Sequence, residues 1–116
     1  MPRDYRLYLD DILESCRKIR QFTEGMSFDE FERDVKTQDA VIRNFEVIWE
    51  AANRLPDEIR SLYHHIEWPK IVGFRNILIH EYFGVKLDTV WSAIKEKLPH
   101  LEVYWFSVNW TNPVFV

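Results

Sequence analysis

The residues best suited to chemistry are Arg75, Asn76, His80 and Tyr82, which lie close together in the segment 75–82. Arginine offers a fork of donors for a phosphate, histidine titrates near neutral pH, and asparagine can orient either one. These groups suit metal-free cleavage of RNA, in which the ribose 2′-hydroxyl attacks the adjacent phosphorus. His80 would act as general acid or base, and Arg75 would stabilise the charge that grows on the phosphoryl oxygens. Tyr82 follows closely enough to place its phenol beside the same phosphate.

A helix from Lys70 to about His80, opened by Pro69, must position these groups. At about 100° per residue, Gly73, Asn76 and His80 fall on one line of that helix. Its core-facing arc is apolar and consists of Ile71, Phe74, Ile77 and Leu78. Glycine inside a helix costs about 1 kcal/mol relative to alanine, so Gly73 indicates a close approach. The approaching element is a second subunit or a helix of the same chain, and a subunit contact on a twofold axis would double the site.

The same residues also have a structural interpretation. An Arg/His pair on a helix belongs more often to a solvated face or a cap than to an active site, so the spacing alone does not establish a function. His64, His65 and Glu67 do not predict a metal site, because adjacent histidines point about 100° apart on a helix and no third ligand joins them. We therefore expect neither a metal nor a cofactor.

Apolar residues at helical spacing predict the elements that surround this segment. The first long helix carries one stripe, formed by Tyr5, Leu9, Ile12, Cys16 and Ile19. Gly25 follows where a left-handed C-cap fits. A second long helix is expected from about Asp39 to Leu55, and its stripe is formed by Val41, Phe45, Ile48, Ala52 and Leu55. Each stripe requires a neighbouring helix to cover it.

Shorter helices are expected between and after these two. Ser27 and Glu30 have the spacing of a capping box. Pro56 should open a short helix from Asp57 to Tyr63. Asp88 should cap the last helix. The apolar side of that helix is formed by Val90, Ile94, Leu98 and Leu101. Pro99 falls within this pattern and should kink or interrupt the helix, because proline lacks the backbone N–H.

These elements predict an all-α fold, an up-and-down bundle of four to five helices in residues 1–103. The tail 104–116 is strongly aromatic and should pack on the bundle or on a partner subunit. A length of 116 residues fits one domain, and 47% hydrophobic residues supply its core. Cys16 is the single cysteine, which excludes an intrachain disulfide and fits a reducing compartment. With no signal-peptide pattern at the N-terminus, we expect a cytoplasmic protein.

The net charge of −4 argues against nonspecific coating of nucleic acid, which requires a basic surface. The segment 60–86 is locally basic. Its charged residues are Arg60, Lys70, Arg75 and Lys86 against Glu67 and Glu81, a balance of +2. An anion is therefore expected to bind in this segment rather than elsewhere.

With these residues identified, the chain resembles HEPN-domain proteins of the HepT-like group, the toxin half of HEPN/MNT toxin–antitoxin pairs. The motif of that group is R-x-x-x-x-H-x-Y, and Arg75, His80 and Tyr82 match it, with Asn76 after the arginine. Resemblance also extends through residues 37–44, 68–73, 80–84 and 98–99 and covers about residues 4–102. Trp49 stands where related sequences often have a small residue, and the tail 104–116 has no counterpart.

This resemblance implies a homodimer in which the two motif helices meet in a cleft, and an RNase that uses Arg75 and His80 without a metal. It also implies a partner, a minimal nucleotidyltransferase (MNT) antitoxin that transfers AMP from ATP to Tyr82, as in a type VII-like toxin–antitoxin pair. The alternative is a noncatalytic HEPN dimer that binds nucleotide or serves as an interaction subunit of the nucleotidyltransferase.

Overall fold

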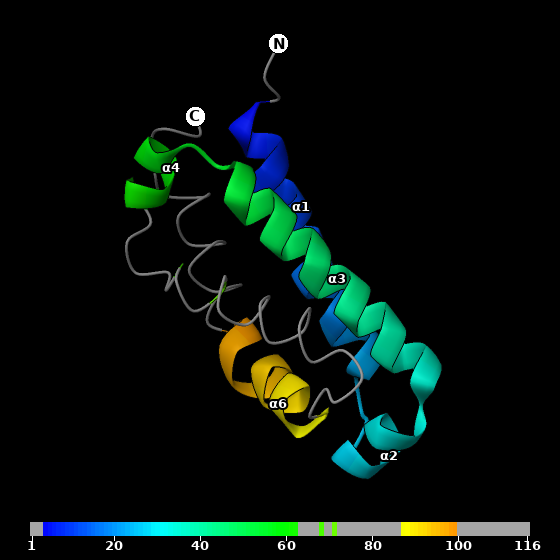
Figure 1. Cartoon of the computed structure of the whole chain (residues 1–116). Coiled ribbons are helices and arrows are strands. Elements are labelled where there is room, and N and C mark those ends of the chain that lie inside the picture. The colour runs from blue at the N-terminus through cyan, green and yellow to red at the C-terminus, as the bar shows by residue number, and fades with distance from the viewer. Residues whose placement is uncertain (1–3, 63–67, 69–70, 72–86, 100–116) are drawn as a thin grey trace.

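The computed structural model describes residues 4–62, 68, 71 and 87–99, and every regular element in these ranges is helical (Figure 1). The α-helices are α1 (Tyr5–Thr23), α2 (Phe28–Arg33), α3 (Val35–Arg54), α4 (Asp57–Leu62) and α6 (Leu87–Ser92). The last continues directly into a π-helical turn, η2 (Ala93–Lys97). The predicted all-α class is therefore confirmed. None of these helices has the length and hydropathy that crossing a bilayer requires.

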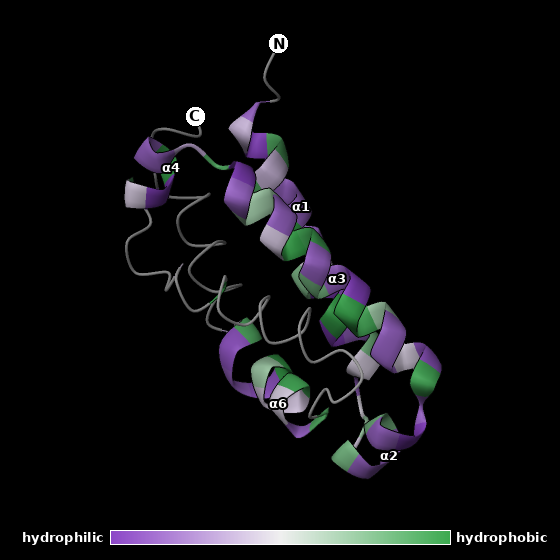
Figure 2. Cartoon of the chain, viewed as in Figure 1, coloured by the Kyte–Doolittle hydropathy of each residue, from purple (hydrophilic) through white to green (hydrophobic). Residues whose placement is uncertain are grey.

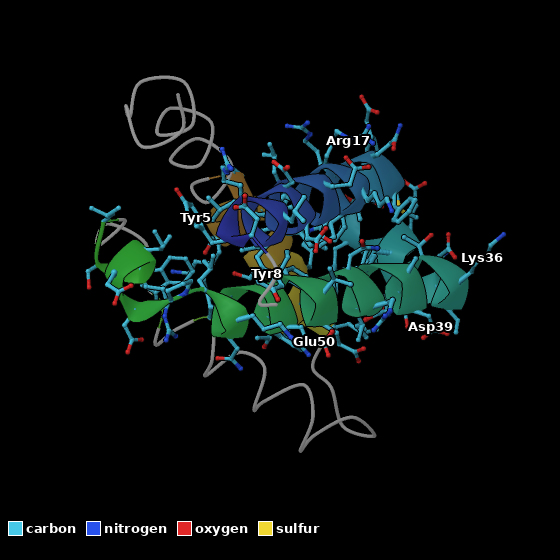
Figure 3. The ribbon with its side chains drawn as sticks, turned by 90° about the horizontal axis from the view of Figure 1, so that it is seen from above. Tyr5, Tyr8, Arg17, Lys36, Asp39 and Glu50 are labelled. Atoms are coloured by element: carbon cyan, nitrogen blue, oxygen red, sulfur yellow. The ribbon has the colours of Figure 1, made fainter. Side chains whose placement is uncertain are left out.

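The centre of the fold is a hairpin of α1 and α3, which lie side by side and run in opposite directions (Figure 1). Every residue of the two predicted stripes is buried except Tyr5, which is partly buried. Both helices are amphipathic, and hydrophilic residues alternate with the hydrophobic ones along them (Figure 2). Charged side chains, among them Arg17, Lys36, Asp39 and Glu50, are exposed on their outer faces (Figure 3).

Local capping explains how α1 passes into α2. Gly25 has φ +74°, the left-handed conformation expected of a residue just past a helix end. The predicted capping box is present, since the Ser27 hydroxyl accepts from the Glu30 N–H and the Glu30 carboxylate accepts from the Ser27 N–H, both at 3.2 Å. The sequence therefore encodes this turn locally.

The start of α3 differs from the prediction. The helix begins at Val35 rather than near Asp39, because Asp34 caps it. The Asp34 carboxylate accepts from the Thr37 N–H at 3.0 Å and from the Thr37 hydroxyl at 2.7 Å. Val35 is 64% exposed, so the added turn carries no apolar stripe that periodicity could detect.

The last helix corrects one prediction and gives the form of the disturbance expected at Pro99. It begins at Leu87, so Asp88 lies in its first turn instead of at its N-cap. Pro99 is itself helical and is the last described residue of this range, so the helix is not interrupted before it. Instead the preceding turn widens, and the Leu98 N–H bonds to the Ala93 carbonyl, five residues back. We attribute this to Pro99, whose ring would clash with the carbonyl of Lys95 in a regular α-helix.

An aromatic contact joins α2 to α6. The Phe31 side chain is fully buried, and its ring centroid lies 5.1 Å from that of Trp91. Phe28 lies on the same indole at 6.2 Å. Val90, Ile94 and Leu98 are buried in the same core, as the apolar side of this helix predicts; Leu101 lies outside the described residues.

Candidate active site

The predicted site residues all fall in the segment 72–86, outside the described residues. They are Gly73, Arg75, Asn76, His80 and Tyr82. Their arrangement therefore remains a prediction from the sequence. The structure describes the elements on either side of the segment and how they are held.

Both ends of the segment are attached to one hydrophobic core. Ile71 precedes it and Leu87 follows it, and both are partly buried against the core built on α1 and α3. Trp68 also packs there, and its indole N–H donates to the Arg60 carbonyl at 3.2 Å. This bond ties α4 to the chain that enters the segment.

The basic segment predicted to bind an anion is described only in part. Arg60 pairs with Asp57 one turn earlier in α4, which offsets its charge. The remaining charged residues counted there, and the histidines near them, lie outside the described ranges. Among the described residues, no three His, Cys, Asp or Glu side chains are grouped so that they could hold a metal ion. His64, His65 and Glu67 are not among them.

Two residues of the stretch 37–44, which carries part of the family resemblance, form side-chain hydrogen bonds, and those of Gln38 connect α3 to α2. The Gln38 amide donates to the Phe31 carbonyl at 2.9 Å and to the Glu32 carbonyl at 3.0 Å. Asn44 donates to the Ala40 carbonyl at 2.8 Å within α3. Sequence reasoning missed the role of Gln38. The Asp34–Thr37 spacing is a detectable cap pattern, but no local pattern connects Gln38 with the end of the preceding helix.

The clear pKa shifts among the described acids come from caps and surface pairs. Hydrogen bonds from Arg6 lower the pKa of Asp4 to about 2. The N–H and hydroxyl of Thr37 lower the pKa of Asp34, and the Arg17 guanidinium lowers that of Glu14. In each case the partner lies two or three residues away on the same helix end or face. These shifts therefore report helix stabilisation rather than an acid–base pair.

These observations define a class of protein. It is an all-α hairpin to which a segment with the motif R-x-x-x-x-H-x-Y is attached at both ends. Comparison with known proteins identifies the family. The family described as Ribonuclease HepT-like matches residues 12–105. The chain belongs to the HepT-like ribonuclease family, and the resemblance inferred from its motif is confirmed.

Relatives span nearly the whole chain. A Methanocaldococcus jannaschii protein with the provisional name RNase MJ0127 is 44% identical over 101 residues, which are 86% of this chain and 84% of that protein. The "Probable ribonuclease HepT" of Thermococcus cleftensis is 40% identical over 102 residues, covering 88% of this chain and 93% of its own. A Caldanaerobacter subterraneus protein with the provisional name RNase TTE0752 is 39% identical, covering 84% and 87%. No solved structure matches the chain significantly.

Proposed function

We propose that this protein is a metal-independent endoribonuclease toxin. The observation that carries the proposal is the R-x-x-x-x-H-x-Y motif of Arg75, His80 and Tyr82 inside a chain of the HepT-like ribonuclease family. The names of its relatives describe ribonucleases, which supports an RNA substrate.

In the proposed reaction the ribose 2′-oxygen loses its proton and attacks the adjacent phosphorus. The bond from phosphorus to the 5′-oxygen breaks, leaving a 2′,3′-cyclic phosphate and a 5′-hydroxyl. The 2′-oxygen gives up one proton and the leaving 5′-oxygen gains one; His80 makes one of these two transfers and water makes the other, while Arg75 stabilises the charge on the phosphoryl oxygens. Asn76 orients these groups, and the Tyr82 phenol contacts the phosphate. No metal ion takes part.

An RNA-cleavage assay in EDTA tests this mechanism. The wild type should cut, whereas His80→Ala should lose about 10²- to 10⁴-fold in rate, the usual contribution of a general acid or base. His100→Ala removes a histidine outside the motif and is the matched control. Circular dichroism should show that both variants fold. Cleavage that stopped in EDTA would exclude the metal-free reaction. A wild type inactive under all conditions would favour the noncatalytic, nucleotide-binding or interaction role.

The proposal includes a homodimer. A site on a helix face that meets its copy would use both subunits, and Gly73 would allow the two backbones to approach. Gly73→Leu should then shift the molar mass in light scattering toward the monomer and lower cleavage in parallel. A dimer that survives this substitution would place the interface elsewhere.

It also includes inhibition by an MNT antitoxin that transfers AMP to Tyr82. The adduct would place a phosphate beside Arg75 and fill the site for the RNA phosphate. Incubation with that partner, ATP and magnesium, followed by peptide mass spectrometry, should find the adduct on Tyr82 and none in Tyr82→Phe. An adduct that persists in Tyr82→Phe would reject the assignment.

A further inference from the structure

Trp68 lies directly before the segment that carries the proposed active site. Its next neighbour is Pro69, which should open the helix from Lys70 to about His80. The backbone is helical at Trp68 and at Ile71, and both side chains pack against the core built on α1 and α3. The chain is therefore attached to the core at the point where it enters the segment.

A hydrogen bond adds a directional contact to this packing. The Trp68 indole N–H donates to the backbone carbonyl of Arg60, eight residues earlier, at 3.2 Å. Arg60 belongs to α4, which ends at Leu62, so its carbonyl finds no N–H donor four residues on within that helix. The indole therefore supplies a donor that the helix itself lacks.

The acceptor of this bond is fixed in α4. The Arg60 N–H donates to the Pro56 carbonyl at 3.0 Å, and the Arg60 guanidinium pairs with Asp57. The Ser61 hydroxyl donates to the Asp57 carbonyl at 2.9 Å. Because these bonds brace the same short helix, the carbonyl that Trp68 reaches has a defined position.

Little apolar burial depends on this bond. All of α4 lies within the described residues and none of its side chains is buried, although Ile59 packs partly against the core. The loss of one hydrogen bond at such a site should cost the fold little. What the bond determines is the orientation of the Trp68 ring, because a flip about the Cβ–Cγ bond would turn the N–H away from the carbonyl.

A small error in placement at Trp68 grows along the helix that follows. At about 1.5 Å per residue, His80 lies about 18 Å further along the predicted helix. A tilt of about 3° at Trp68 would displace His80 by about 1 Å over that length. Reacting groups must be placed to within about 0.5 Å, and a displacement of about 1 Å can lower a rate about 10²-fold.

We propose that Trp68 is a positioning residue of the nuclease. Its indole N–H fixes, against α4, the start of the helix that carries Arg75 and His80. This inference rests on the proposed ribonuclease function, since it assigns Trp68 to that reaction. Trp68 touches no reacting atom in this scheme, so it should affect turnover rather than substrate binding. The competing explanation is a purely structural role, in which the ring only fills space.

Trp68→Phe keeps an aromatic ring and removes the N–H. Trp91→Phe is the matched control, because Trp91 is also partly buried against the core. Its indole N–H, unlike that of Trp68, has no acceptor among the described residues. Thermal melts measure the stability of each variant, and RNA cleavage is measured per folded molecule over a range of substrate concentrations.

The expected effect follows from the strength of the bond. A neutral hydrogen bond of ordinary strength corresponds to a change of about fivefold in an equilibrium constant. The fraction of molecules with a correctly placed helix should therefore fall about fivefold in Trp68→Phe, and kcat with it, while KM stays unchanged. Trp91→Phe should keep the wild-type kcat per folded molecule. Equal kcat in the two variants, or a change in KM alone, would overturn the positioning role.

Amide signals in ¹H–¹⁵N NMR spectra give a measurement that does not require cleavage. Trp68→Phe should shift the signals of residues 74–80, more than one helical turn away, and should shift them more than Trp91→Phe does. Such shifts, found with a wild type that cuts no RNA, would retain the positioning of this segment by Trp68 and reject the proposed nuclease. Cleavage by the wild type, with neither these shifts nor a lower kcat in Trp68→Phe, would do the reverse.

The wild type tests the bond itself. The Trp68 indole proton should exchange with solvent deuterium more slowly than that of Trp91, because only the former is hydrogen-bonded. Equal exchange rates would mean that the bond is not formed and would overturn the proposal. Loss of folding in Trp68→Phe would assign Trp68 the structural role instead.

Discussion

Gln38→Glu tests the contact between α2 and α3, which we call the α2–α3 joint, by changing the one side-chain nitrogen of Gln38 that donates to α2. The Gln38 amide nitrogen donates to the Phe31 carbonyl at 2.9 Å and to the Glu32 carbonyl at 3.0 Å. The substitution keeps the size of the side chain and replaces the donor by an oxygen. At neutral pH a carboxylate then faces two carbonyl oxygens, and both hydrogen bonds are lost.

The decrease in the free energy of unfolding caused by Gln38→Glu should be moderate. Each neutral hydrogen bond contributes about 0.5 to 1.5 kcal/mol, and the lower half of that range applies. The Phe31 carbonyl keeps a second donor, the Asp34 N–H at 3.2 Å, and the Glu32 carbonyl is reached by solvent. A negative charge near the start of α3 recovers about 0.5 kcal/mol from the helix dipole. The net decrease in the free energy of unfolding should be about 1 kcal/mol, or about 4 °C in Tm for a chain of this length.

The pH dependence has a definite sign. When protonated, the introduced carboxyl can donate to one of the two carbonyls, so folding raises its pKa above the usual value of about 4.3. The folded state then binds more protons than the unfolded state between those two pKa values, and stability falls as pH rises through that interval. The deficit against wild type should be small near about pH 4 and fully developed by about pH 7.

Urea unfolding followed by circular dichroism at a series of pH values measures this deficit. Gln38→Met is the matched control, because it also removes both bonds but cannot titrate, so its own deficit should not depend on pH. The free energy of unfolding of Gln38→Glu should therefore rise relative to that of Gln38→Met as pH falls. If the free energy of unfolding depended on pH in the same way in both variants, the introduced carboxyl would not face the carbonyls. If both variants were as stable as wild type, the two hydrogen bonds of Gln38 would not stabilise the contact between α2 and α3.

Four further substitutions test the elements around the contact between α2 and α3. Ser27→Ala removes one half of the capping box with Glu30 and should lower the free energy of unfolding by about 1 kcal/mol in urea unfolding. Gly25→Ala should lower it by about 1 kcal/mol because φ is +74°, even though a Cβ there meets no atom of the described residues within 4 Å; a stabilised variant would contradict the left-handed cap. Phe31→Ala should lose about 3 to 5 kcal/mol in the same assay, and the partly exposed Phe28→Ala less than half of that; equal losses would contradict the burial of Phe31.

The hairpin of α1 and α3 was predictable because its buried apolar residues recur at helical spacing in the sequence. Burial follows the helical repeat, so the stripe that ends at Ile19 and the stripe that begins at Val41 both pack as expected. The start of α3 was missed because the added turn is solvated, and an exposed Val35 gives no periodic signal. A disturbance of the helix at Pro99 was expected, but its form was missed, because the clash is relieved by widening a turn, which no spacing in the sequence reveals.

The functional features likewise separate into those that local sequence reveals and those that depend on how the helices pack. The motif of Arg75, His80 and Tyr82 is contiguous, so sequence comparison detects it directly, and the family match confirms the group to which it belongs. A hollow of about 610 Å³ is lined by Arg20 of α1 and Lys95 of the last helix, which are far apart in the sequence and line it together only because both helices pack on one core. Sequence reasoning assigned the local positive charge to the segment 60–86 and so did not consider this pair.

The attachment of both ends of the segment 72–86 has a consequence for activity. A catalytic arginine and histidine must be held to within a fraction of an ångström, which requires a rigid support rather than a favourable local sequence. Ile71 and Leu87 pack on one core, and the Phe31–Trp91 contact fixes the helix that follows. Damage to the α2–α3 joint should therefore reduce cleavage through the population of folded protein, and the rate per folded molecule of Gln38→Glu should equal that of wild type. A lower rate per folded molecule would mean that the joint positions the reacting groups themselves.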